Sequence, residues 1–499
     1  MVSGTVLGHE RVMNWLRNLR AYAVIIPVCA GVFIAADDQT SIVVVLPELL
    51  PDFRIGPGEL DRASWTVTGY LIGYTAAMPI MGRVSDRFGH RAVFLGALAI
   101  FILGSALVAV SPDLSRLVGS DSPDLNWMIG ARVFQAIGGG AMIPVAIASV
   151  GDVLPRARHA MAFAIIGASA EAGGVIGPLW AGLITNVSSW EWVFWSNIPL
   201  GLAVIVSLKF SPAGARNPAR IDLVGAALFV AALGLLTAAL SRAGETDTAF
   251  AVLLAGAVAA LLATIWWHRR NDHPLLPIRL LKTMKFSAAN LAHLAVGVSL
   301  ITAMVTVPLM ANTVLGRSPL DGGLMLLRMT AAIPFGAIAG GVWVQRWGAR
   351  WPSMAGFVLA AIGLAAMSGW DLDISDPAMT LHLAIAGFGF GLLIAPIHLS
   401  GMLLARGGER GSASALITVS RMIGMTIGLA VITSWGTARF ENLAGDAPLT
   451  VEGMEEITQA GLTVFRGFFL SAAAVSLAGV VPAWLMSDNR ADSVNVAAE

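Results

Sequence analysis

Six ionisable residues lie inside long apolar stretches of the sequence, where a charge is costly. These residues are Asp37, Asp38, Arg132, Glu171, Arg328 and Arg421. A charged side chain at membrane depth is strongly unfavourable unless it is paired or hydrated, so each is a candidate functional residue. Three acids and three bases can balance one another. Such a set can bind and release a proton, because burial favours the neutral carboxyl and a nearby cation favours the carboxylate.

The acids of this set are candidates for proton coupling. Asp38 lies in the middle of the first apolar stretch, where it can bind a proton or pair two helices. Its neighbour Asp37 points about 100° away on a helix, and which of the two faces a cavity is left open. Glu171 lies in a glycine-rich stretch and is either a proton site or a buried polar anchor. Two histidines in apolar stretches, His293 and His398, are expected to form hydrogen bonds within the helix bundle.

The bases have two interpretations each. Arg132 and Gln135 are three residues apart and share a helix face, so Arg132 either relays protons or braces loop carbonyls. Arg421 can hold an acid from the other half of the chain. Arg328 can instead extend to water at the membrane surface. We predict proton coupling for Arg132. For Gln135, Arg421 and Arg328 we predict that they bridge the two bundles or line the substrate cavity.

The composition indicates that these residues belong to an integral membrane protein. The 499 residues are 56% hydrophobic and 12% charged, with a formal net charge of zero, whereas a soluble protein has about 25% charged residues. A single cysteine, Cys29, excludes an internal disulfide. The sequence has no nucleotide-binding loop, metal cluster or nucleophile–base pair, so we expect no cofactor, no metal, no nucleic acid and no enzyme activity.

The hydropathy pattern predicts an all-α fold with about fourteen membrane spans, each near the roughly 20 residues that a spanning helix needs. The predicted spans are 21–49, 64–83, 91–111, 127–150, 159–185, 193–210, 221–241, 248–267, 287–310, 321–345, 350–370, 378–404, 409–436 and 463–487. In this layout, most lysines and arginines lie on the side that holds both termini. The positive-inside rule therefore predicts that both termini are cytoplasmic.

A short charged turn between two apolar runs occurs twice in the chain. Its first copy contains Gly82, Asp86, Arg87, Gly89 and Arg91. The second copy has, at the same spacing, Gly341, Gln345, Arg346, Gly348 and Arg350. Paired repeats are typical of transporters in multi-span proteins. We expect the first copy to act as a conformational latch, in which Asp86 stabilises the facing N-terminus of the thirteenth span.

The first turn resembles the loop between spans 2 and 3 of the major facilitator superfamily. Asp38-Gln39-Thr40 followed by Leu46-Pro47 resembles the span-1 signature of its fourteen-span drug:proton antiporters. Arg132, Gln135 and Gly138 resemble the span-4 motif. The span-5 antiporter motif is matched by Gly167, Gly173, Gly177, Pro178 and Gly182, of which we expect Gly173, Gly177 and Pro178 to serve as hinge or packing residues.

A narrower similarity is to the lipid-exporting branch of that family. It lies in Trp65 to Tyr74 and in Ser420 to Met425. Those relatives move triacylglycerides outward and work with a periplasmic lipoprotein. That branch extends spans 11 and 12 beyond the membrane, whereas the connector from Asp371 to Ala378 in this chain is short. The similarity therefore does not decide whether this chain guides lipid by the same route.

The resemblance implies two six-helix bundles with two inserted helices between them. We expect an N-terminal bundle in 1–210, the inserted helices and a cytoplasmic linker in 211–286, a C-terminal bundle in 287–487, and a disordered tail in 488–499. The expected function is proton-coupled export of amphipathic or lipidic molecules by alternating access, in a bacterial cytoplasmic membrane. The alternatives are a multidrug:proton antiporter of cationic lipophilic drugs and, from another class, a non-transporting receptor or assembly partner. The expected partners are the bilayer, protons, an amphipathic or lipid substrate and, in the lipid branch, a periplasmic lipoprotein.

Overall fold

The computed structural model consists of helices joined by short connections. It describes residues 25–42, 45, 48–49, 51–54, 60–117, 124–209, 222–242, 248–271, 278–317, 319–405, 409–444 and 451–487. The first helix is Ile25–Ile42. The helices that follow are α2 (Leu60–Phe88), α3 (His90–Ala109), α4 (Ser111–Leu117), α5 (Leu125–Val153), α6 (Arg156–Val187), α7 (Glu191–Leu208), α8 (Leu223–Ser241), α9 (Thr248–Arg270), α10 (Ile278–Leu281), α11 (Met284–Thr313), α12 (Pro319–Trp347), α13 (Arg350–Met367), α14 (Asp376–Met402), α15 (Arg410–Ala444), α16 (Val451–Ala478) and α17 (Val480–Leu485).

The helices occupy the predicted spans closely. Within the described residues, 12 helices are long and apolar enough to cross a membrane. The apolar stretch Val224–Leu240 in α8 is shorter, and α2, 29 residues long, fills the range predicted for the second span. The all-helical membrane fold is therefore confirmed, while the count of fourteen spans stays a prediction.

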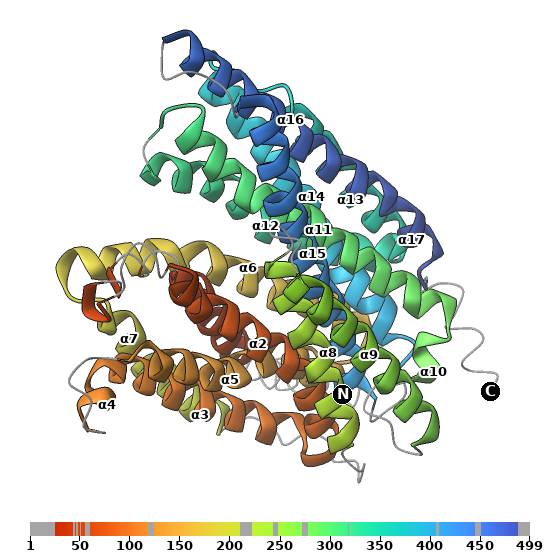
Figure 1. The fold of residues 1–499 in the computed structure, drawn as a ribbon. Coiled ribbons are helices and arrows are strands. Elements are labelled where there is room, and N and C mark those ends of the chain that lie inside the picture. The colour runs from red at the N-terminus through yellow and green to blue at the C-terminus, as the bar shows by residue number, and fades with distance from the viewer. Residues whose placement is uncertain are drawn as a thin grey trace, which may run out of the picture.

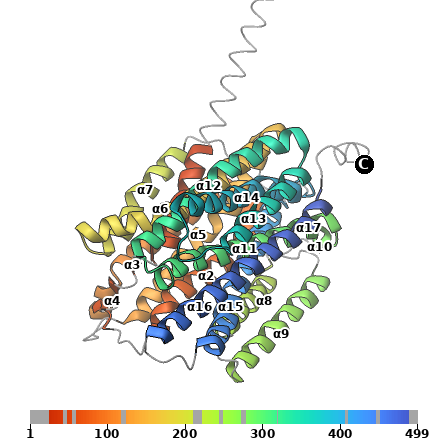
Figure 2. The same ribbon diagram turned by 90° about the horizontal axis from the view of Figure 1, so that it is seen from above.

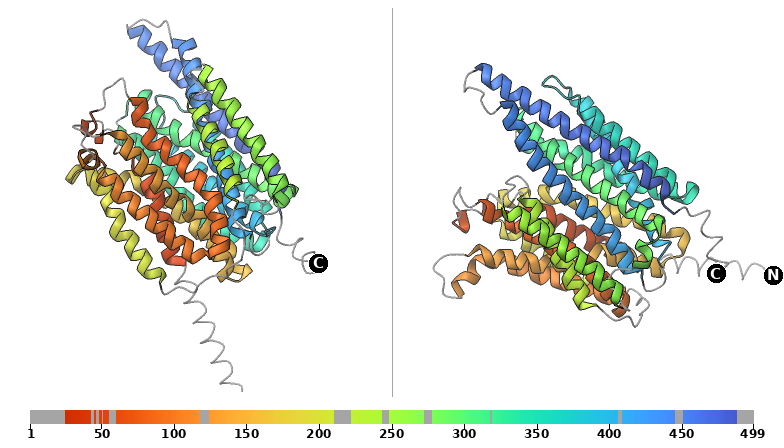
Figure 3. Two further views of the ribbon diagram at one scale, coloured as in Figure 1. Left: turned by 60° about the horizontal axis from the view of Figure 1, so that its bottom comes forward. Right: turned by 45° about the vertical axis from the view of Figure 1, so that its right-hand side comes forward.

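The helices form two groups that meet along one side of each (Figure 1). One group, the N-terminal group, contains the helix Ile25–Ile42 together with α2, α3, α5, α6 and α7 (Figure 2). The other, the C-terminal group, contains α11 to α17. Helices α8 and α9 form a hairpin, of which α8 contacts α2 and α15 (Figure 2). The two groups diverge toward the end that carries α4 and the start of α16, and converge at the opposite end (Figure 3). The predicted linker residues 210–221 and 272–277 and the predicted tail 488–499 lie outside the described residues. The predicted domain boundaries stay predictions.

Two helices extend well past their predicted spans. The connector at 371–378 is short, as the sequence indicates, since α13 ends at Met367 and α14 begins at Asp376, whereas α15 and α16 continue furthest beyond the spans predicted at 409–436 and 463–487. With 35 residues, α15 is about 52 Å long at 1.5 Å per residue, against a hydrocarbon core of about 30 Å. Hydropathy ends a predicted span where polar residues begin, but the backbone hydrogen bonds of a helix continue through them. The upper ends of α15 and α16 project from the molecule in Figure 1.

The repeated turn has the same backbone conformation in both copies. Gly89, between α2 and α3, has a φ of 94°, and Gly348, between α12 and α13, has a φ of 77°. Glycine adopts this left-handed region without the steric cost that a Cβ brings. The shared geometry explains why glycine recurs at this position of the repeat.

Helix α6 packs closely against the first helix through glycine. A Cβ at Gly173 would meet the backbone carbonyl oxygen of Phe33, whereas a Cβ at Gly174 would find only Thr40 Cγ2, at 3.8 Å. Gly177 faces the Asp37 carbonyl and Thr40 in the same interface, and Pro178 follows it inside α6. This close approach fixes the position of the neighbouring Glu171 relative to the first helix.

Gly173→Ala is therefore expected to destabilise the protein by about 1–3 kcal/mol, the usual cost of overpacking. Gly174→Ala is the matched control, and it should be neutral or stabilising by up to about 1 kcal/mol, because alanine is the better helix former. Thermal unfolding of the detergent-solubilised variants measures the difference. Equal unfolding midpoints for the two variants would mean that the interface relaxes to admit the methyl group.

Candidate functional site

A buried ion pair lies at the centre of the N-terminal group of helices. Arg132 Nη1 on α5 donates to Asp38 Oδ2 at 2.6 Å, and both side chains are fully buried. Gln135 Nε2 and Asn197 Nδ2 donate to Asp38 Oδ1 at 2.9 and 2.8 Å. Both amides also donate to Ser105 Oγ, at 2.7 and 3.2 Å. The cluster thus joins the first helix, α3, α5 and α7.

The guanidinium of Arg132 is held from several sides. It also donates to Gln135 Oε1 at 2.7 Å, and its Cζ lies 4.1 Å from the centre of the Tyr70 ring and 5.5 Å from that of Phe194. Cation–π contacts of this kind are strongest where water is absent. Its Nε and Nη2 atoms have no hydrogen-bond partner among the described residues. Asp38 therefore supplies the negative charge that makes burial of Arg132 possible.

A second ion pair connects the two groups of helices. Arg421 Nη2 on α15 lies 2.6 Å from Glu171 Oε1 on α6. Unlike the first pair, these side chains are partly accessible, at 16% and 13%. The pair therefore bridges the two halves at a place that small molecules or water can reach.

Two further candidate residues lie apart from these pairs. Asp37 is buried, and its carbonyl accepts a hydrogen bond from Ser41 at 2.8 Å. Arg328 belongs to α12 and reaches the start of α14. Its Nη1 donates to Thr380 Oγ1 at 3.0 Å and lies 3.7 Å from Asp376 Oδ1. The structure thus separates Arg328 from Glu171, and this location matches the alternative in which it extends to the surface.

The two histidines of the apolar stretches are in contact. The rings of His293 and His398 are 4.9 Å apart at an interplanar angle of 84°. His293 Nδ1 pairs with the carbonyl of Ile417 at 2.8 Å, and His398 Nδ1 with that of Ile394 at 3.0 Å. These bonds lie within the C-terminal group, as expected for structural histidines.

The first copy of the repeated turn contacts the other half of the molecule. Asp86 at the end of α2 accepts hydrogen bonds from the backbone N–H groups of Gly411 and Ser412, at 3.0 and 3.3 Å, and from Ser412 Oγ at 3.1 Å. These groups form the first turn of α15, where a carboxylate is favoured by the unpaired N–H groups. Gly82 lies against Gly411 in the same contact.

The described contacts of the other charged residues of that turn lie within the N-terminal half. Arg87 is exposed, with its Cζ 5.2 Å from the centre of the Phe88 ring. Arg91 Nη2 donates to the carbonyl of Lys209 at 2.6 Å. Asp86 is the charged residue of this turn whose described hydrogen bonds reach α15, and the latch role expected for it stays a prediction.

Asp86→Asn is expected to weaken the contact between α2 and α15 by about 1–2 kcal/mol, because it removes the negative charge from the N-terminus of a helix. The change can be followed by spin–spin distances between labels at Phe88 and Trp351, both exposed, in a Cys29→Ala background. The expected result is a new population with a longer distance. Gln345→Asn is the matched control, because Gln345 occupies the same repeat position but is exposed. An unchanged distance distribution in Asp86→Asn would contradict the latch.

Sequence reasoning missed two members of the first cluster. Neither Asn197 nor Ser105 is among the candidate residues named from the sequence, because each is an uncharged side chain without a titratable group. A polar residue in the middle of an apolar span, as each is, was the one available indication.

Comparison with known proteins identifies the family. The model of the Major Facilitator Superfamily matches residues 28–429. The chain belongs to the major facilitator superfamily. This membership makes it a multi-pass membrane transporter and confirms the resemblance read from the sequence motifs.

Two relatives within the superfamily match most of the chain. The triacylglyceride transporter of Mycobacteroides abscessus is 35% identical over 428 residues, which cover 82% of this chain and 81% of the relative. The one from Mycolicibacterium smegmatis is 33% identical over 492 residues, covering 92% and 86%. The crystal structure of the human organic anion transporter MFSD10 superposes with a TM-score of 0.63 at 15% identity, covering 91% of this chain and 99% of that chain. This structural similarity supports the superfamily fold.

Proposed function

We propose that this protein exports a neutral lipid in exchange for protons by alternating access. The observation that carries the proposal is the Glu171–Arg421 pair, which joins the two halves and is partly accessible. Relatives named triacylglyceride transporters support the lipid as substrate. Transporters of this type rock one bundle against the other around a central site.

The pair couples proton binding to this motion through its charge. With Glu171 ionised, its attraction to Arg421 holds α6 and α15 together. A proton on Glu171 removes that attraction, so the two helices can separate and the site can change its access. Because the pair is partly accessible, a proton can reach it.

The Asp38 cluster acts differently, because all its described contacts lie within the N-terminal half. Protonation of Asp38 would act by changing the packing of the first helix, α5 and α7. We propose that the cluster keeps this half rigid and that Arg132, with Asp38, forms a second proton-binding group. Asp37, on a different face of the first helix, is the third candidate.

We place the protein in the inner membrane of a bacterium, with both termini cytoplasmic, since the relatives are bacterial and the positive charges cluster on that side. The two halves then meet at the cytoplasmic side, through Asp86 and α15, and diverge toward the outside. A periplasmic lipoprotein would receive the lipid there, near the projecting ends of α15 and α16.

The proposal is tested with the purified protein in liposomes that contain an internal pH dye. A pH gradient is imposed, and a fluorescent triacylglyceride or a cationic dye is supplied in separate samples. Proton flux and lipid transfer that depend on each other support the proposal. Flux with the cationic dye and none with the lipid would identify a multidrug antiporter instead, and no response to either would favour a non-transporting receptor.

A further inference from the structure

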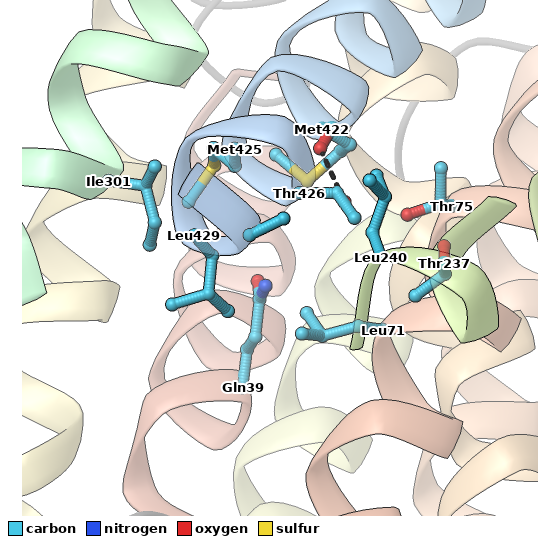
Figure 4. Close-up of a pocket in the computed structure, with 11 residues that line it drawn as sticks. Gln39, Leu71, Thr75, Thr237, Leu240, Ile301, Met422, Met425, Thr426 and Leu429 are labelled. Carbon is cyan, nitrogen blue, oxygen red and sulfur yellow. Dashed lines mark hydrogen bonds between the residues drawn. The ribbon is translucent and has the colours of Figure 1, made fainter. Parts of the chain in front are cut away.

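A cavity of about 250 Å³ lies between the two halves and reaches the inserted helix α8. Figure 4 shows its lining. It is bounded by the first helix, α2, α8, α11 and α15, and its lining includes Gln39, Thr75, Thr237, Met422, Met425 and Thr426. The inserted hairpin thus contributes directly to a cavity between the transport bundles.

The lining is uncharged. No residue among those described as bounding the cavity carries a charge. Thr237 Oγ1 donates to the carbonyl of Leu233 at 2.9 Å, and Thr426 Oγ1 to that of Met422 at 3.0 Å. Two of the three threonine hydroxyls in the lining are thus used within their own helices, so the wall offers few donors to a ligand. A cation would lose its hydration here without gaining a counter-charge.

The shape and chemistry fit a hydrocarbon chain. Pockets that enclose a whole drug-sized ligand have about 300–1,000 Å³, so this cavity suits part of a larger molecule. Met422 and Met425 give α15 an adaptable apolar face, because methionine fills irregular space. The one carboxamide, that of Gln39, points into the cavity (Figure 4). Its N–H groups can donate to a neutral acceptor such as an ester carbonyl.

We propose that this cavity binds one acyl chain of a neutral glycerolipid, with Gln39 donating to an ester carbonyl and α8 closing the cavity on one side. The inference rests on the proposed function, of which it names the substrate site. Met425 lies one helical turn after Arg421 on α15 and so shares its face of the helix, which places the cavity and the Glu171–Arg421 pair on the same segment of α15. Loading of the cavity and release of the pair therefore act on the same segment of α15.

Photolabelling of the full-length protein in liposomes tests the site. The probe is a triacylglyceride with a diazirine in one acyl chain, and a phosphatidylcholine with the same diazirine reports contact with bulk lipid. The expected result is labelling of α8 and α15 by the triacylglyceride, suppressed by unlabelled triolein. Labelling elsewhere, or labelling that triolein does not suppress, overturns the inference.

Two variants sharpen the test. Thr237→Trp fills the cavity and should reduce the triolein-sensitive labelling of α15 by about tenfold, which corresponds to a loss of about 1.4 kcal/mol in binding free energy. Ala231→Trp, at an exposed position of the same helix, is the matched control and should label as wild type. In wild type, triolein should compete better than a hydrocarbon without esters, and Gln39→Leu should abolish that difference. Equal competition in wild type would remove the role of Gln39.

Transport measured in the same liposomes separates this inference from the proposed function. Triacylglyceride transfer without labelling of α8 and α15 would overturn the site and leave the function standing. Absence of both transfer and triolein-sensitive labelling would overturn both.

Discussion

Glu171→Gln is expected to abolish the stimulation of lipid transfer by a pH gradient. Glutamine has nearly the same shape as glutamate but cannot release a proton, and it leaves Arg421 without its counter-charge. The free-energy difference that proton binding makes between the two access states is then lost. A ligand that binds both states equally shifts neither.

The measurement compares lipid transfer with and without the gradient in liposomes of matched protein content. Wild type should show a gradient-dependent rate, and Glu171→Gln should show equal rates under both conditions. Glu171→Asp is the matched control, because it keeps the titratable carboxyl and should retain part of the stimulation. Full stimulation in Glu171→Gln would assign the coupling to Asp38 or Asp37 instead.

The reciprocal changes test whether the pair acts as a unit. Arg421→Gln should also lose the stimulation, because Glu171 then has no cationic partner from which protonation could release it. The charge-reversed double variant, Glu171→Arg with Arg421→Glu, should recover part of it if the bridge alone is needed. Double-variant cycles of this kind isolate the interaction of the two residues.

Asp38→Ala is expected to destabilise the protein by about 3–5 kcal/mol, the cost of removing one partner of a buried ion pair. Arg132 would remain as a buried charge without a counter-ion, and Gln135 and Asn197 would lose the acceptor at Asp38 Oδ1. The loss should appear as a lower thermal unfolding midpoint in detergent.

Asp37→Asn is the matched control for this stability effect, because Asp37 is the adjacent acid and lies outside the Asp38 cluster. It should unfold near the wild-type temperature. Combining Asp38→Asn with Arg132→Met should recover much of the stability, since it removes both charges together. If Asp38→Ala unfolds like wild type but loses transport, Asp38 acts in proton coupling without a structural role.

The class of protein and the positions of its helices follow from the amino-acid sequence. Runs of about 20 apolar residues have few stable alternatives to a membrane-spanning helix, because backbone N–H and C=O groups must be paired within the bilayer. The repeated turn was also readable, since Gly89 and Gly348 meet a local backbone requirement. Such features can be predicted from the sequence because they depend on residues that are close together in the chain.

Which charged side chains pair with one another depends on the packing of the helices. Asp38 and Arg132 are 94 positions apart, and the sequence shows that both are buried without showing the rotation of their helices. Arg328 and Arg421 looked alike in the sequence, yet one lies near the start of α14 and the other reaches Glu171. The sequence does not show which helix Ser105 faces or that α8 contributes to the cavity. Such contacts depend on how whole helices pack, because a turn of 100° per residue separates a side chain facing a partner from one facing lipid.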